Sequence, residues 1–81
     1  MDDKQVLSHI EELVAEEHRL LDRHHGDAGL DADGHARLDE VKVQLDRFWD
    51  LLRQRRALEE FGEDPDAAST RPASTVENYR Q

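Results

Sequence analysis

One stretch, residues 37–61, constrains the fold of this chain more than any other. It contains no Gly or Pro, and it holds the single Trp and both Phe of the sequence. Its apolar residues recur at alternating spacings of three and four, the period of an α-helix with one buried side. These residues are Leu38, Val41, Leu45, Phe48 and Leu52. The pattern predicts a long amphipathic helix over about residues 35–61.

A second apolar stripe of the same period precedes this helix. It comprises Val6, Leu7, Ile10, Leu13, Val14, Leu20 and Leu21. No Gly or Pro interrupts the segment, so it predicts a helix over about residues 4–25. The run GDAGLDADG, residues 26–34, separates the two stripes; Gly26 can end the first helix, and Asp31 or Asp33 can cap the second. A short breaker between two helices predicts an all-α, antiparallel two-helix hairpin over residues 1–62.

The apolar arc of the second helix is wider than one neighbouring helix can cover. Trp49 flanks the seam on one side, and Leu51 and Leu58 flank it on the other. A two-helix hairpin cannot enclose a core, and small domains usually need a staple or a partner. We therefore expect a homodimer that forms a four-helix bundle. The predicted interface residues are Phe48, Trp49, Leu51, Leu52 and Leu58.

Polar side chains interrupt the apolar stripe of the first helix. Glu17 lies near the middle of the stripe, and His24 lies two turns further along the same side. Glu17 can pair with Gln44 or Lys42 at a wet part of the seam. Alternatively, this polar seam can fix register or oligomeric state, as single polar residues do in coiled coils. At the open end of the hairpin, Arg55 and Arg56 are expected opposite Asp2 and Asp3.

The C-terminal tail, residues 63–81, carries two helix-start signals. Asp64-Pro65 predicts a cap followed by a short turn over residues 66–69. Ser74 followed by Glu77 fits a capping box, which predicts a last short helix over residues 75–80. Val76 and Tyr79 could clip that helix onto the hairpin. The alternative is a disordered tail, because the segment is rich in Ala, Ser, Thr and Pro.

Composition narrows the classes of partner. The formal net charge is −9, which disfavours nucleic acid and anionic membranes. There is no Cys, which excludes disulfides and thiolate metal sites and favours a reducing compartment. The acidic start, MDDKQ, does not resemble a signal peptide, and no apolar run is long enough to span a bilayer. We expect a soluble, cytoplasmic protein whose partner is a second copy or another protein.

Two clusters could in principle carry chemistry. His24, His25 and His35 are expected to meet Asp33 at the hairpin tip, where imidazole and carboxylate could bind zinc or nickel. The acidic run could also suggest calcium, but the first EF-hand ligand position is occupied by Gly29. No Ser has an adjacent base and orienting acid, so we expect no enzymatic activity and no cofactor.

Several runs resemble an uncharacterised family of small actinobacterial helical proteins, a domain of unknown function. They are ELVAEEHRLL (residues 12–21), FWDLLRQRRALEEFGEDPD (residues 48–66) and RPASTVENY (residues 71–79). The resemblance covers nearly the whole chain. It implies a small, cytoplasmic, helical protein, and it assigns no activity to any residue. The Gly/Asp-rich loop varies in such proteins, which argues against a site built there.

The sequence as a whole predicts a non-enzymatic helical interaction or adaptor module. Apolar residues on the flank of the second helix would contact the partner. Charged residues around them would determine which partner binds. The alternative is a metal-binding protein that uses the His and Asp residues of the hairpin tip.

Overall fold

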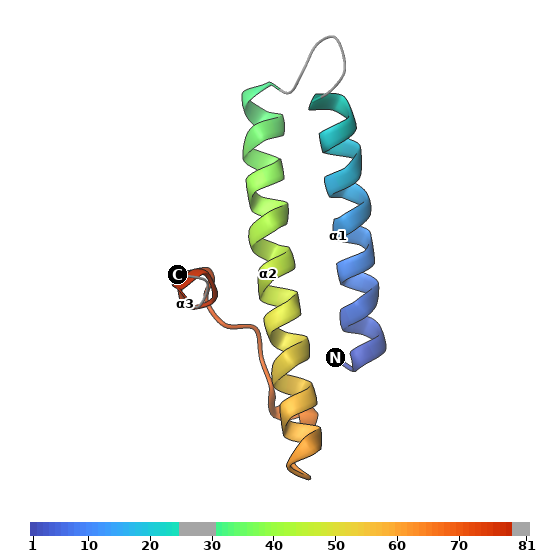
Figure 1. The fold of residues 1–81 in the computed structure, drawn as a ribbon, viewed down its shortest axis with the longest axis vertical. Coiled ribbons are helices and arrows are strands. Elements are labelled where there is room, and N and C mark those ends of the chain that lie inside the picture. The colour runs from blue at the N-terminus through green and yellow to red at the C-terminus, as the bar shows by residue number, and fades with distance from the viewer. Residues whose placement is uncertain (25–30, 79–81) are drawn as a thin grey trace.

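The computed structural model describes residues 1–24 and 31–78, which form three α-helices and one 3₁₀ turn. Helix α1 spans Asp3–His24, and helix α2 spans Ala32–Glu60. The turn η1 spans Pro65–Ala67, and helix α3 spans Ala73–Asn78. Helices α1 and α2 lie side by side and antiparallel (Figure 1). The molecule is elongated, with extents of 52 × 26 × 16 Å.

The core is one apolar seam between α1 and α2. Val6, Val41 and Leu52 are its most completely buried large side chains. The other buried members are Ile10, Leu13, Leu20, Leu38, Leu45 and Leu51. The two predicted apolar stripes face each other in this seam, except for Leu7, which is exposed. The predicted all-α hairpin is confirmed.

Helix α2 begins earlier than the sequence pattern predicted. The Asp31 side chain caps the helix by accepting a hydrogen bond from the backbone N–H of Gly34, at 2.7 Å. The predicted start near residue 35 was therefore late, because Gly34 was assigned to the breaker but occupies the first helical turn. The rest of the predicted breaker, residues 26–30, lies outside the described residues, as does the predicted cap at Gly26.

Helix α2 ends as the sequence predicted, at a glycine. Gly62 has φ of 73°, a left-handed conformation that favours glycine. The Gly62 N–H donates to the Glu59 carbonyl at 3.1 Å, and the Glu63 N–H donates to the Leu58 carbonyl at 2.8 Å. These two bonds form a Schellman motif, which satisfies the last carbonyls and turns the chain back along α2.

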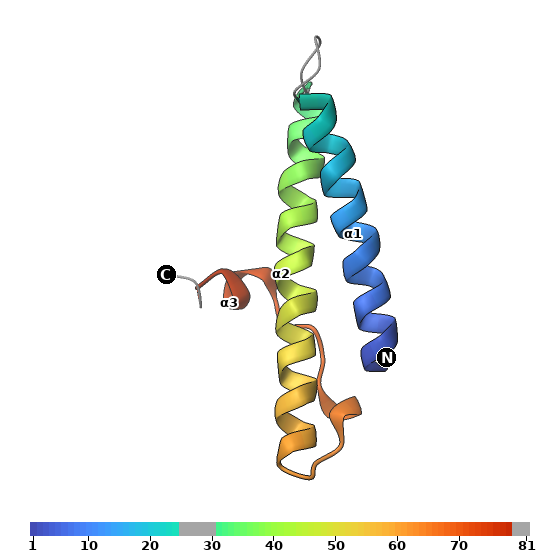
Figure 2. The same ribbon diagram turned by 45° about the vertical axis from the view of Figure 1, so that its right-hand side comes forward.

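The tail turns back along α2 from the open end of the hairpin. Its first part, η1, lies on the same side of α2 as α1, where Arg55 contacts both, whereas α3 lies on the opposite side (Figure 1 and Figure 2). Figure 2 shows η1 beside the last turns of α2, and α3 standing off the middle of the helix. Asp64 caps η1 by accepting the Asp66 N–H at 2.9 Å, which confirms the predicted Asp-Pro start. Val76 is buried, as predicted for its contact with the hairpin. Tyr79, its expected companion, lies outside the described residues.

The predicted start of the last helix was wrong by two residues. Helix α3 begins at Ala73, so Ser74 is inside the helix and cannot be its cap. The Pro72 carbonyl accepts the Val76 N–H at 3.2 Å, which completes the first turn. A proline immediately before the helix is compatible with this start, because its fixed φ suits the entry into a helix and its missing N–H is not needed there.

Candidate functional site

Arg55 joins three segments of the chain. Its side chain is only 4% exposed, yet it is charged. Its Nε donates to Asp3 of α1 at 2.6 Å, and its Nη1 donates to Asp66 of η1 at 2.9 Å. The same Nη1 also lies 3.2 Å from the Pro65 carbonyl oxygen. The guanidinium therefore ties the start of α1 and the start of the tail to the end of α2.

Electrostatics at this junction favour the charged forms of both partners. The hydrogen bonds that Arg55 donates to Asp3 and Asp66 raise the pKa of Arg55 above its ordinary value. The hydrogen bond from Arg55 lowers the pKa of Asp66. The predicted ion-pair end of the hairpin is confirmed for Arg55 with Asp3, and Arg56 is exposed.

Asp50 holds the second connection between α2 and the tail. It is only 3% exposed, although it lies on the side of α2 that faces away from α1. Arg71 of the tail binds both carboxylate oxygens of Asp50, with its Nε at 2.8 Å. The Gln54 amide donates to Asp50 at 2.9 Å and to the Ser69 carbonyl at 2.9 Å. Arg47 adds a bond from its Nε to the Arg71 carbonyl at 2.9 Å.

The environment of Asp50 stabilises its carboxylate. The hydrogen bond from Arg71 lowers the pKa of Asp50, and the Gln54 amide acts in the same direction, whereas burial opposes both. A bidentate pair of this kind fixes both the position and the orientation of the tail. We call the two connections, Arg55 with Asp66 and Asp50 with Arg71, the tail clamps.

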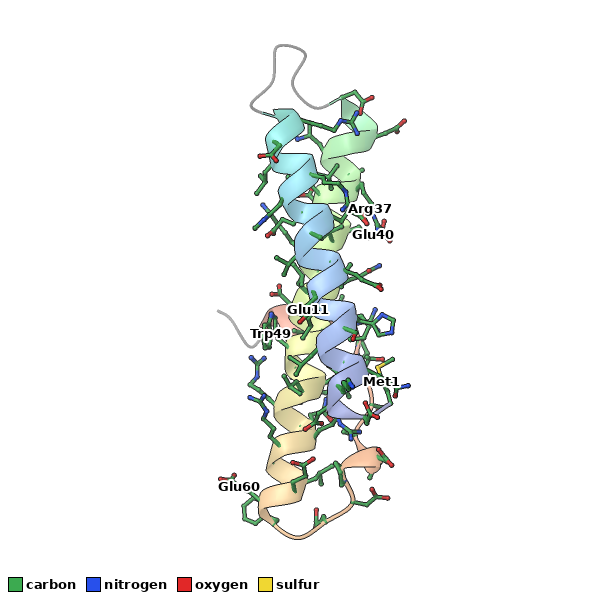
Figure 3. The ribbon with its side chains drawn as sticks, turned by 90° about the vertical axis from the view of Figure 1, so that its right-hand side faces the viewer. Met1, Glu11, Arg37, Glu40, Trp49 and Glu60 are labelled. Carbon is green, nitrogen blue, oxygen red and sulfur yellow. The ribbon has the colours of Figure 1, made fainter. Side chains whose placement is uncertain are left out.

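The polar contact across the hairpin seam is made by Glu16, the neighbour of the predicted seam residue Glu17. Arg37 of α2 binds both carboxylate oxygens of Glu16, with its Nη2 at 2.7 Å, and this hydrogen bonding lowers the pKa of Glu16. Glu17, the predicted seam residue, is partly buried. Gln44, one of its expected partners, donates instead to Glu40 at 3.1 Å. Figure 3 shows Arg37 and Glu40 near the loop end of the hairpin.

The structure divides the five predicted interface residues into two groups. Leu51 and Leu52 are buried within one chain, so neither presents an apolar surface to a second copy. Phe48 is partly buried and stacks on the His9 ring, with centroids 5.1 Å apart. Leu58 is partly buried, and Trp49 is 41% exposed on the flank of the hairpin (Figure 3).

An apolar hollow lies where the end of α2 meets η1. Its volume is about 350 Å³, and Phe61 at its edge is 81% exposed. The hollow is lined by Gln54, Ala57, Leu58, Phe61, Ala67 and Ala68. The sequence pattern predicted Phe61 only as the last residue of the second helix. Phe61 immediately precedes Gly62, where the chain reverses direction. This position could have indicated that the Phe61 ring is exposed, because the chain turns away from the seam there.

The predicted metal cluster cannot be assembled from the described part of the chain. Within it, no group of three or more His, Cys, Asp or Glu side chains is placed to hold a metal ion. Asp33 and His35 are exposed at the start of α2. The His24 side chain and all of His25 lie outside the described residues.

None of the described helices is both long enough and apolar enough to cross a membrane. Helix α2 has the necessary length, with 29 residues, but charged side chains occur along all of it. The expectation that the chain contains no membrane-spanning segment therefore holds for the described residues.

Comparison with known proteins places the chain among uncharacterised relatives. It is 45% identical over 77 residues to the uncharacterized protein Rv0898c of Mycobacterium tuberculosis (strain ATCC 25618 / H37Rv). The uncharacterized protein Mb0922c of Mycobacterium bovis shows the same identity. Each alignment covers 95% of this chain and 88% of the relative. No solved structure matches the chain.

The runs that carried the family resemblance contain the tail clamps. Residues 48–66 supply Asp50, Arg55 and Asp66, and residues 71–79 begin with Arg71. Those charged residues therefore have a structural role, namely holding the tail against α2. The family described as "Protein of unknown function (DUF2630)" matches residues 2–81. The chain belongs to this family, whose actinobacterial relatives are uncharacterised.

Proposed function

We propose that this protein is a non-enzymatic helical interaction module that self-associates through the apolar hollow at the end of α2. The observation that carries the proposal is Phe61, which is 81% exposed beside that hollow. An exposed aromatic ring next to an apolar depression is typical of an interaction site. Because ring and hollow lie on one surface, each copy can insert its Phe61 into the hollow of the other. Such mutual insertion is the requirement for a two-fold symmetric interface.

The proposal retains the expected homodimer but changes the residues that form it. Leu51 and Leu52 are covered by their own chain, whereas Leu58 lies in the hollow together with Phe61. The surface is small compared with the roughly 800 Å² that each partner buries in a standard interface. We therefore expect a weak, reversible dimer rather than an obligate four-helix bundle.

Sedimentation velocity over a wide concentration range tests this proposal. The wild-type chain should shift from monomer to dimer as its concentration rises. The shift should strengthen with added salt, because salt screens the repulsion between two chains of net charge −9. Phe61→Ala should abolish the shift without lowering the melting temperature, since the ring makes little contact within its own chain.

Leu7→Ala is the matched control, because it also removes a solvent-accessible apolar side chain but lies on α1, away from the hollow. It should leave the association unchanged. A wild-type chain that stays monomeric at the highest concentration would disprove self-association. Equal association of wild type and Phe61→Ala would exclude the hollow as its site.

A further inference from the structure

A second hollow, more polar than the Phe61 hollow, lies where α1, α2 and the tail meet. Its volume is about 360 Å³. It is lined by His9 of α1, by Gln44, Arg47 and Phe48 of α2, and by Thr70 of the tail. The two clamps place the tail across α2, so the hollow exists only while the tail is docked. It is separate from the Phe61 hollow, with which it shares no lining residue.

The chemistry of this hollow differs from that of the chain around it. The chain has 20 acidic residues against 11 Lys and Arg, yet none of the five lining residues is acidic. Four of the five can donate hydrogen bonds through a guanidinium, an imidazole, an amide and a hydroxyl. A cluster of donors around one fixed positive charge is a site for an anion.

The structure holds the Arg47 guanidinium in place for this role. Its Nε donates to the Arg71 carbonyl at 2.9 Å, which anchors the side chain by one nitrogen. Among the described side chains, its two terminal amino groups meet no acceptor within hydrogen-bonding distance. Arginine binds carboxylate and phosphate with paired N–H groups, so the terminal groups offer such a pair to a ligand.

Part of the lining is aromatic. The His9 and Phe48 rings lie nearly parallel, with 6° between their planes. This stack supplies a flat apolar surface beside the donors, which suits a ring or short hydrocarbon attached to the anion. Glu40 accepts a hydrogen bond from the amide of Gln44, one of the lining residues, and this nearby negative charge disfavours ligands with several negative groups.

We propose that the hollow formed by His9, Gln44, Arg47, Phe48 and Thr70 binds a small organic anion, a carboxylate or phosphate monoester carrying one apolar group. Arg47 binds the anionic group, Thr70 adds a hydroxyl donor, and the His9–Phe48 stack contacts the apolar group. Because the ligand bridges α2 and the tail, its binding stabilises the docked tail by mass action. The site thus makes tail docking responsive to a metabolite, independently of self-association.

The test is a titration of the full chain with phenyl phosphate and benzoate, followed by ¹H–¹⁵N NMR. Both should shift the signals of residues 9, 44, 47, 48 and 70, and should slow hydrogen exchange around Val76. Inorganic phosphate should bind more weakly, because it lacks the apolar group. Benzylamine, which has the same ring with a positive charge, should not bind at all. Equal binding of benzylamine would overturn the proposal.

Two substitutions locate the site. Arg47→Gln should weaken phenyl phosphate binding about tenfold, the effect of losing a charged hydrogen bond. The matched control is Arg53→Gln, which removes the same charge from an exposed position on the same helix and should change nothing. Equal weakening by both variants would reveal only non-specific attraction to positive charge and would overturn the proposal.

Arg47→Gln also removes the bond to the Arg71 carbonyl, so it could loosen the tail. Thr70→Val provides the second measurement, because Thr70 is exposed and lines the hollow without belonging to either tail clamp. This variant should keep the tail docked and bind phenyl phosphate several-fold more weakly. Unchanged binding by both Arg47→Gln and Thr70→Val would place the ligand elsewhere and refute the site.

Discussion

The two sides of α2 are held by different physical interactions. The side facing α1 is an apolar seam in which Leu52 is 1% exposed. The side facing the tail is built around ions: Asp50 is 3% exposed, and Arg71 binds it from the tail. Apolar burial is non-directional and tolerates local adjustment, whereas a bidentate ion pair fixes one geometry. The comparison indicates a stable hairpin carrying a tail whose position depends on charge.

The apolar seam should show the largest single effect. Leu52→Ala should lower the free energy of unfolding by about 3 kcal/mol, because it removes a fully buried side chain and leaves a cavity. Urea denaturation followed by circular dichroism measures this loss. Leu7→Ala, at the edge of the same hairpin, should stay within about 0.5 kcal/mol of wild type. A loss for Leu52→Ala as small as that of Leu7→Ala would contradict the assigned seam.

The ionic side should show an effect of intermediate size. Asp50→Asn should lower the free energy of unfolding by about 2 kcal/mol, because a buried charged hydrogen bond is lost while Arg71 can still reach water. The Val76 methyl signals should move towards their solvent-exposed positions, whereas signals from the seam should stay. Asp39→Asn, at an exposed position of the same helix, is the control and should change neither. Loss of the seam signals together with those of Val76 would show that the two sides are not separable.

Lowering the pH should destabilise the tail side of α2 before the seam side, without any substitution. The folded-state pKa values of Asp50 and Asp66 are lowered by Arg71 and Arg55 respectively. The unfolded chain therefore binds more protons in the acidic range, so stability falls as pH drops below the ordinary carboxylate pKa near 4. We expect the Val76 region to lose its protection from hydrogen exchange at a higher pH than the seam. Simultaneous loss of both would refute a charge-dependent tail.

The ion pair across the seam should show the smallest effect. Glu16→Gln removes a partner of Arg37, but that guanidinium is substantially exposed and keeps Glu40 nearby. Exposed pairs contribute little, so the loss should be clearly below that of Asp50→Asn in the same denaturation assay. An equal or larger loss would show that the hairpin itself depends on charge.

The apolar side of α2 was predictable because its apolar residues recur with the period of an α-helix. Residues such as Leu38, Val41 and Leu45 recur every three or four positions, and that spacing alone indicates a buried stripe. The start of η1 was predictable for a local reason, since Asp64 and Pro65 are adjacent and need no distant partner. The contact between Arg55 and Asp3 was predictable as well, because an antiparallel hairpin brings its open ends together.

The ionic side was not predictable by the same means. Asp50 lies opposite the seam on α2, where a charged residue normally indicates solvent, and its partner Arg71 is 21 residues away. No periodicity connects two such positions. The wide apolar arc did indicate that α2 needs a second neighbour, but it could not distinguish another chain from the returning tail. Leu51, predicted to face a second copy, is buried within its own chain.

A specific ion pair between Asp50 and Arg71 holds the tail on α2. A double-mutant cycle with Asp50→Asn, Arg71→Gln and the combined variant measures that interaction directly by urea denaturation. We expect a coupling free energy of at least about 1 kcal/mol, with the combined variant hardly less stable than Asp50→Asn alone. Additive losses, equal within about 0.4 kcal/mol, would contradict it.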